Sequence, residues 1–201
     1  MEPQTSDKDI TTFWIKVYFN LEDGYIRAAV KRAYRDFNRT LESLPKKEGD
    51  RKILRDIWIE VFERKLKEVL SSTFPSQNEF DVWHQSTCFL IRTANENYPL
   101  SQGQAQKWIN MTLKYLFAMG ETNVPGIKNN YPYFHIPLDR IIIGKLYNFG
   151  LGNFDGKPWS KINDYDSYYN YQKDIRRLYK DRIPMDVEFE LFNSSYNLSV
   201  D

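Results

Sequence analysis

The feature that most constrains the fold of this chain is apolar periodicity at helical spacing along nearly its whole length. In residues 25–44 the apolar side chains recur every three or four positions, and arginines and lysines fill much of the opposite face. Such spacing places the apolar side chains on one face of an α-helix. Similar patterns occur at residues 53–70, 78–94, 104–119, 138–149, 164–181 and 184–193. The sequence therefore predicts an all-α fold of about seven helices.

The segments between these patterns indicate how the chain is organised. Residues 10–20 hint at a strand, although a short helix fits them equally well. Residues 120–135 and 150–160 are rich in glycine, proline and asparagine and are predicted loops. The chain contains no repeat, low-complexity tract or domain linker. We therefore expect residues 1–201 to form a single domain, with residues 1–22 as an N-terminal segment.

Composition narrows the class of protein. Hydrophobic residues make up 41% of the chain and aromatic residues 16%, enough to form a hydrophobic core. Cys88 is the only cysteine, which excludes a disulfide within the chain and a cysteine-based iron–sulfur centre. The first ten residues lack the apolar core of a signal peptide, and no apolar run approaches the ~20 residues that span a bilayer. We expect a cytoplasmic protein that does not bind membranes.

The net charge of +1 neither requires nor excludes a nucleic-acid partner, because an acidic face can balance a basic one. The polar face of residues 25–44 carries Arg27, Lys31, Arg32, Arg35 and Arg39. This stripe would either face phosphates or only make the helix soluble. Residues 164–180, "DYDSYYNYQKDIRRLYK", could stack on bases and contact phosphates. More often, such a helix packs its tyrosines inward and exposes its charges.

Two short stretches, about thirty residues apart, precede helical patterns. The first is Gly103-Gln104-Ala105-Gln106-Lys107, at the start of the helix predicted for 104–119. Backbone amides at such a turn favour an anion. The second ends in Pro137-Leu138-Asp139. Asp139 is either an ordinary helix cap or one half of a catalytic pair. Lys107 has a similar alternative, because a lysine considered alone is more often solvated than catalytic. A lysine and an aspartate at the starts of facing helices would converge on one cleft.

In their order and all-α setting, these stretches resemble the catalytic segments of the helix–hairpin–helix DNA glycosylases, most closely the 8-oxoguanine DNA glycosylase branch. That family has Leu-Pro-Gly-x-Gly-x-Lys in its hairpin and, after a loop, Val-Pro-Val-Asp opening a helix. Here Ala105 replaces the second glycine, and His135-Ile136-Pro137-Leu138-Asp139 is similar to the second segment. The resemblance covers residues 98–149. The single cysteine excludes the iron–sulfur branch of the superfamily.

The resemblance implies a base-excision glycosylase with lyase activity, acting on a damaged base flipped out of duplex DNA. Lys107 would be the nucleophile, and Asp139 would be the electrostatic and acid–base partner. Nucleic acid would contact Gly103, Gln104, Ala105, Gln106 and His135, and the base pocket would include Trp108 and Phe134. No metal or other cofactor is implied, since His84 and His135 are the only histidines and lie far apart in the sequence. Two alternatives remain. One is a catalytically silent module of the same fold that binds nucleic acid or a protein. The other is an unrelated all-α interaction protein.

Overall fold

The computed structural model describes residues 5–152 and 156–194, and every regular element in these ranges is helical. The α-helices are α1 Asp7–Tyr18, α2 Gly24–Phe37, α3 Glu48–Ser71, α4 Gln77–Thr93, α5 Gln102–Met119, α6 Arg140–Asn148, α7 Tyr165–Leu178 and α8 Pro184–Asn193. Three 3-10 helices join them: η1 Asn38–Thr40, η2 Tyr131–Tyr133 and η3 Trp159–Lys161. The all-α prediction is confirmed. Within the described ranges, no helix combines the length and the apolar character needed to span a bilayer.

The described part of the chain has one α-helix more than the seven predicted. This additional helix is α1, and it includes most of residues 10–20, which the sequence left open between a strand and a short helix. Its start is a capping box, in which the Ser6 hydroxyl accepts from the Asp9 amide and the Asp9 carboxylate accepts from the Ser6 amide. This reciprocal arrangement satisfies two amides at a helix N-terminus. Ile15 and Phe19 anchor α1 in the core, whereas Phe13 and Trp14 are exposed.

The second difference concerns the first predicted helix, which was expected to reach Leu44. α2 ends at Phe37, and the chain continues through η1 into an extended segment. The Thr40 hydroxyl donates to the Phe37 carbonyl oxygen at 2.7 Å. Leu41 and Leu44 still pack against the core from this segment. The apolar spacing therefore continued past the end of the helix.

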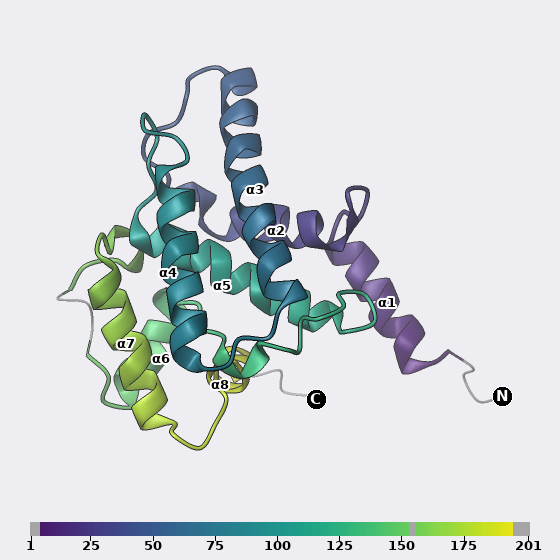
Figure 1. Cartoon of the computed structure of the whole chain (residues 1–201), viewed down its shortest axis with the longest axis vertical. Coiled ribbons are helices and arrows are strands. Elements are labelled where there is room, and N and C mark those ends of the chain that lie inside the picture. The colour runs from purple at the N-terminus through teal and green to yellow at the C-terminus, as the bar shows by residue number, and fades with distance from the viewer. Residues whose placement is uncertain (1–4, 153–155, 195–201) are drawn as a thin grey trace, which may run out of the picture.

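Helix α5 crosses the middle of the molecule, with α1 towards one side and α7 towards the other (Figure 1). All of its residues are buried except Tyr115, Phe117 and Ala118, and its most extensive packing is against α2. Many of the buried residues are polar and find partners inside the protein, as buried polar groups must. For example, the Trp108 indole N–H donates to the Val30 carbonyl oxygen at 2.9 Å.

The buried apolar residues form two clusters. The larger is built mainly from α2, α3, α4 and α5, and the smaller from α6, α7 and α8 with the segment that precedes α6. Helix α8 contributes to both, since Met185 packs in the larger cluster while Val187 and Leu191 pack in the smaller. Helix α8 therefore lies where the two clusters meet.

Candidate functional site

The structure brings Lys107 and Asp139 together. The Lys107 Nζ lies 2.6 Å from Asp139 Oδ2, and the lysine side chain is almost completely buried. The other oxygen, Oδ1, accepts from the amides of Ile141 and Ile142, both at 2.9 Å. Asp139 is therefore the N-cap of α6 and the partner of Lys107 at the same time. The two roles that the sequence left as alternatives use different oxygens of one carboxylate.

The carboxyl group of Asp139 is held in its ionised form. Burial alone would raise its pKa, because a low-dielectric environment disfavours charge. The positive charge of Lys107 and the hydrogen bonds from Ile142 and Ile141 outweigh burial, so the pKa is lowered. The charged pair thus joins the side of α5 to the start of α6.

Lys107 and Asp139 line a cleft of about 660 Å³. Its walls come from α2, η1, α5, α6 and α8, with Tyr18 of α1 and Trp159 of η3 at the edges. Aromatic side chains form part of the lining: Tyr18, Tyr115, Trp159, Phe189 and Phe192. This volume is in the range of ligand-binding pockets, which commonly occur where structural units meet.

The cleft is more basic than the chain as a whole. Six basic side chains and three carboxylates line it, so the lining carries a surplus of three positive charges. Each carboxylate already has a basic partner in Arg32–Asp36, Lys107–Asp139 and Lys114–Glu188. Arg35, Arg39 and Arg140 are exposed, and none forms an ion pair within the described ranges. A cleft of this charge attracts an anionic ligand.

A second buried ion pair lies beside the first. Lys114, two turns after Lys107 on α5, places its Nζ 2.5 Å from Glu188 Oε2 of α8. Both side chains are nearly inaccessible to solvent. The Lys114 ammonium also lies 4.7 Å from the centroid of the Phe189 ring and 4.4 Å from that of Phe192. Burial lowers the pKa of Lys114 and raises that of Glu188. The attraction between the two charges shifts each pKa in the opposite direction but does not outweigh burial.

The turn predicted to bind phosphate makes contacts within the protein. α5 begins at Gln102, so Lys107 lies in its second turn, and Gly103 lies inside the first. The Gly103 amide donates to the Ile162 carbonyl oxygen at 2.9 Å. A Cβ on Gly103 would lie 1.8 Å from the Trp159 carbonyl oxygen, so this glycine allows η3 to approach α5 closely.

We expect Gly103→Ala to destabilise the fold by about 3 kcal/mol, because η3 would have to move away from α5. The matched control is Gly144→Ala, at an exposed helical position of α6 with no atom within 4 Å of the added Cβ. That change should stabilise the protein by about 0.5–1 kcal/mol. Urea unfolding of both variants measures the difference, and equal free energies of unfolding would contradict the packing role of Gly103.

The other residues of this turn also make internal contacts. Gln104 closes a capping box with Ser101 and donates to the Thr40 carbonyl oxygen at 2.9 Å. Ala105 is fully buried, and Gln106 donates to the Leu138 carbonyl oxygen at 2.9 Å. None of Gly103, Ala105 and Gln106 lines the cleft, and Gln104 lines a separate pocket.

The two residues predicted for the base pocket lie in the larger core cluster. Trp108 is packed between Tyr34, Phe37 and Phe62 and has no exposed surface. Phe134 is 1% exposed. Contact with a ligand would require the core to open, so the aromatic rings available in the cleft are other ones, chiefly Phe189 and Phe192.

His135 belongs to a buried polar network. The rings of His84 and His135 lie 4.4 Å apart between centroids, although the residues are distant in sequence. His135 Nε2 lies 2.7 Å from Asp81 Oδ1, and Nδ1 lies 2.7 Å from the Tyr168 hydroxyl oxygen. A neutral imidazole that donates from Nε2 and accepts at Nδ1 satisfies both contacts. Within the described ranges, no group of three His, Cys, Asp or Glu residues is arranged to hold a metal ion.

This network makes stability depend on pH. Burial, opposed by the hydrogen bond to Asp81, lowers the pKa of His135 from 6.5 to about 4, and burial also lowers the pKa of His84. The unfolded chain therefore binds more protons between pH 6.5 and 4, and stability falls as the pH falls through this window. We expect about 3 kcal/mol less stability at pH 4 than at pH 7 from His135 alone. Urea unfolding between these pH values tests this, and His135→Gln should flatten the dependence.

Several residues of the cleft were not predicted. Lys114 lies seven positions after Lys107 on the same helical face, and Arg140 directly follows Asp139, so periodicity and adjacency could have indicated both. Glu188, Phe189 and Phe192 reach the cleft only through the packing of α8. No local pattern marks these three residues as part of a site.

No protein-family model, curated protein or solved structure matches this chain.

Proposed function

We propose that this chain is a DNA base-excision glycosylase with lyase activity, acting on a damaged base in the basic cleft. One observation carries the proposal. The Lys107 amine lies 2.6 Å from the Asp139 carboxylate, in a cleft that also holds three exposed arginines. None of these arginines forms an ion pair with a residue that the structure describes. The order and spacing of the two segments in the sequence support the same function.

The reaction would use the two side chains in sequence. Lys107 must lose a proton before its lone pair can attack, and Asp139 Oδ2 is close enough to accept that proton. The Nζ–C1′ bond then forms as the N-glycosidic bond breaks, and the departing base takes the electron pair and the proton from Asp139. The C1′–O4′ bond of the sugar then breaks, O4′ takes one proton from the Lys107 nitrogen, and a protonated Schiff base between Lys107 and C1′ results. The Asp139 carboxylate, free again after protonating the base, would then take a C2′ proton, and the C3′–O bond breaks so that the 3′ phosphate leaves and the strand is cleaved.

The rest of the cleft would bind the DNA. Arg35, Arg39 and Arg140 would contact phosphate oxygens, because guanidinium groups pair with phosphates through two hydrogen bonds. The rings of Phe189 and Phe192 offer apolar surface for a base removed from the stack. As Asp139 passes its proton to the departing base, the carboxylate that forms would stabilise the positive charge that develops on the sugar.

A catalytically silent nucleic-acid-binding protein is the second candidate, and a specific observation favours it. The amide of Gly103 and the side chains of Gln104 and Gln106 are hydrogen-bonded inside the protein. In such a protein the Lys107–Asp139 ion pair would have only a structural role, which is to hold the start of α6 against α5. DNA binding without covalent chemistry would identify this alternative.

Borohydride capture separates the two candidates. Borohydride reduces a Schiff base to a stable amine, so an active lyase becomes covalently attached to its DNA. The substrates are duplexes that contain one 8-oxoguanine or one abasic site, with an undamaged duplex as control. We expect capture on damaged DNA only. If the protein binds these duplexes but captures none, the lyase proposal fails and the silent binder remains.

Charge removal in the cleft should reduce the salt dependence of DNA binding. We expect each of Arg35→Gln, Arg39→Gln and Arg140→Gln to decrease the slope of log affinity against log salt by up to about 0.9. The control is Arg177→Gln, on the exposed side of α7 and outside the cleft. Fluorescence anisotropy at several salt concentrations gives the slopes. Equal slopes for all four variants and the parent protein would exclude the cleft as the phosphate-binding surface.

A further inference from the structure

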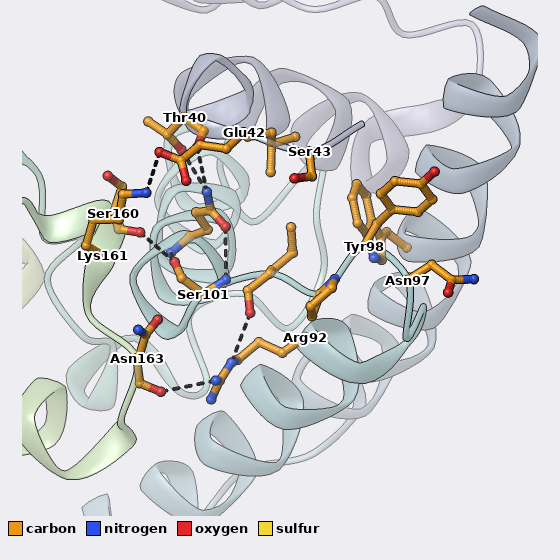
Figure 2. A pocket seen from close by; sticks show the side chains of 15 residues that line it. Thr40, Glu42, Ser43, Arg92, Asn97, Tyr98, Ser101, Ser160, Lys161 and Asn163 are labelled. Atoms are coloured by element: carbon orange, nitrogen blue, oxygen red, sulfur yellow. Dashed lines mark hydrogen bonds and ion pairs between the residues drawn. The ribbon is translucent and has the colours of Figure 1, made fainter. Parts of the chain in front are cut away.

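A second hollow lies at the N-terminal end of α5. It has a volume of about 440 Å³ and is lined by the segment after η1, the connection between α4 and α5, and η3. Figure 2 shows Thr40, Glu42 and Ser43 on one side, Asn97 and Tyr98 on another, and Arg92 and Asn163 on a third. Polar and apolar groups both contribute to its lining.

The charged groups of this pocket already have partners. Arg92 donates to the carbonyl oxygens of Leu100 and Asn163 and to the side chain of Gln102 (Figure 2 draws the first two). Lys161 is paired with Glu42. Unlike the basic cleft, the pocket therefore has no cationic side chain without a partner in the described ranges. It suits an uncharged part of a ligand better than a phosphate.

One polar group of the pocket is buried and unsatisfied. Trp58 lines the pocket, is 1% exposed, and its indole N–H has no acceptor among the described residues. A buried donor without an acceptor costs free energy, and a ligand acceptor would recover it by uncovering the indole nitrogen, which is inaccessible in the free protein. Tyr98, half-buried on the same pocket, offers an aromatic ring. A planar ring with hydrogen-bond acceptors would satisfy both features.

The pocket and the basic cleft adjoin each other. Arg39 lines the cleft and Thr40 the pocket, and Trp159 lines the cleft and Ser160 the pocket. On α5, Gln104 lines the pocket and Lys107 the cleft, and these two backbone positions are about 4.5 Å apart along the helix axis. Neighbouring nucleotides of a DNA strand are about 3.4 Å apart along the duplex axis. The shared walls make it sterically reasonable for a strand in the cleft to place a nearby unpaired base at the pocket.

We infer that this pocket is a second subsite, which takes an intact nucleobase of the DNA strand near the nucleotide at Lys107. The base would stack on Tyr98 and accept a hydrogen bond from the Trp58 indole. This inference rests on the proposed function, because it uses the strand that the basic cleft would hold. Contact with this base would make DNA binding depend on the DNA sequence next to the damaged nucleotide.

Photocrosslinking tests the subsite directly. The probe is a duplex with a central abasic site, in which 5-iodouracil replaces thymine at one neighbouring position at a time. Irradiation breaks the carbon–iodine bond, and the uracil radical couples to an aromatic ring that touches it. We expect one or two positions to crosslink to Tyr98, as located by mass spectrometry. Tyr98→Leu should remove this crosslink and weaken binding of the duplex about tenfold.

Two further variants make the result specific. Tyr147→Leu removes an exposed tyrosine of α6 outside both hollows, and its crosslinking pattern should match the parent protein. Ser43→Phe places a ring at an exposed position on the pocket and should block the crosslink while leaving the core intact. Capture at Lys107 without any crosslink to Tyr98 would overturn the subsite alone. Absence of any DNA binding would overturn the proposed function and the subsite together.

Discussion

Lys107→Gln is expected to reduce borohydride capture on an abasic duplex at least about 100-fold, because the amine that forms the Schiff base is gone. DNA affinity should change less than about threefold, since Lys107 is nearly buried and the arginines that would hold the phosphates remain. The glutamine amide can still donate to Asp139, so the start of α6 stays capped. Capture yield and anisotropy on the same preparation measure both quantities. The control is Lys145→Gln, a lysine outside the cleft whose loss should leave capture unchanged.

Asp139→Asn separates the carboxylate's catalytic role from its structural one. Asparagine is also a good N-cap, so the hydrogen bonds to Ile141 and Ile142 can persist. The charge beside the reacting sugar is lost, and we expect single-turnover capture to slow by about 10²–10³-fold while DNA binding is retained. If Lys107→Gln still captures DNA and Lys114→Gln does not, the cleft is correct but the nucleophile is the second lysine.

Much of the fold could be predicted from the sequence, because helical periodicity is a local property. The apolar spacing of residues 184–193 matches α8 at both ends, since Pro184 can begin a helix and the apolar pattern stops near Asn193. The predicted first helix ran too far, because Leu41 and Leu44 keep the spacing while packing from an extended segment. Spacing alone does not distinguish a buried helical residue from a buried residue in a loop.

The site, like the fold, could be predicted from the sequence only in part. Lys107 and Asp139 could be paired by inference because each closely follows a glycine or a proline near the start of a helical pattern. The role of Gly103 could not be predicted, because the backbone that approaches it belongs to η3, more than fifty residues later. Two other features likewise depend on how helices distant in the sequence pack: the contact between His84 and His135, and the position of Glu188 in the cleft. These contacts come from the tertiary structure, and no local pattern records them.

The buried pair of Lys114 and Glu188 should produce the largest stability effect among the residues of the cleft. Glu188→Met leaves a buried ammonium without its counter-charge, and we expect the free energy of unfolding to fall by about 3–5 kcal/mol. Lys114→Met should cost a similar amount, because a buried carboxylate is then left alone. The double variant, with methionine at both positions, should recover most of the loss, since neither charge of this pair remains buried.

This double-mutant cycle also distinguishes a structural pair from a functional one. Urea unfolding of the four proteins at pH 7 gives the coupling energy, and Asp174→Asn, in an exposed pair on α7, should change stability by less than about 0.5 kcal/mol. A double variant that is as stable as the parent but binds DNA more weakly would mean that the pair is retained for the ligand. Additive losses in the cycle would show that the two side chains stabilise the fold independently, contrary to the contact seen between them.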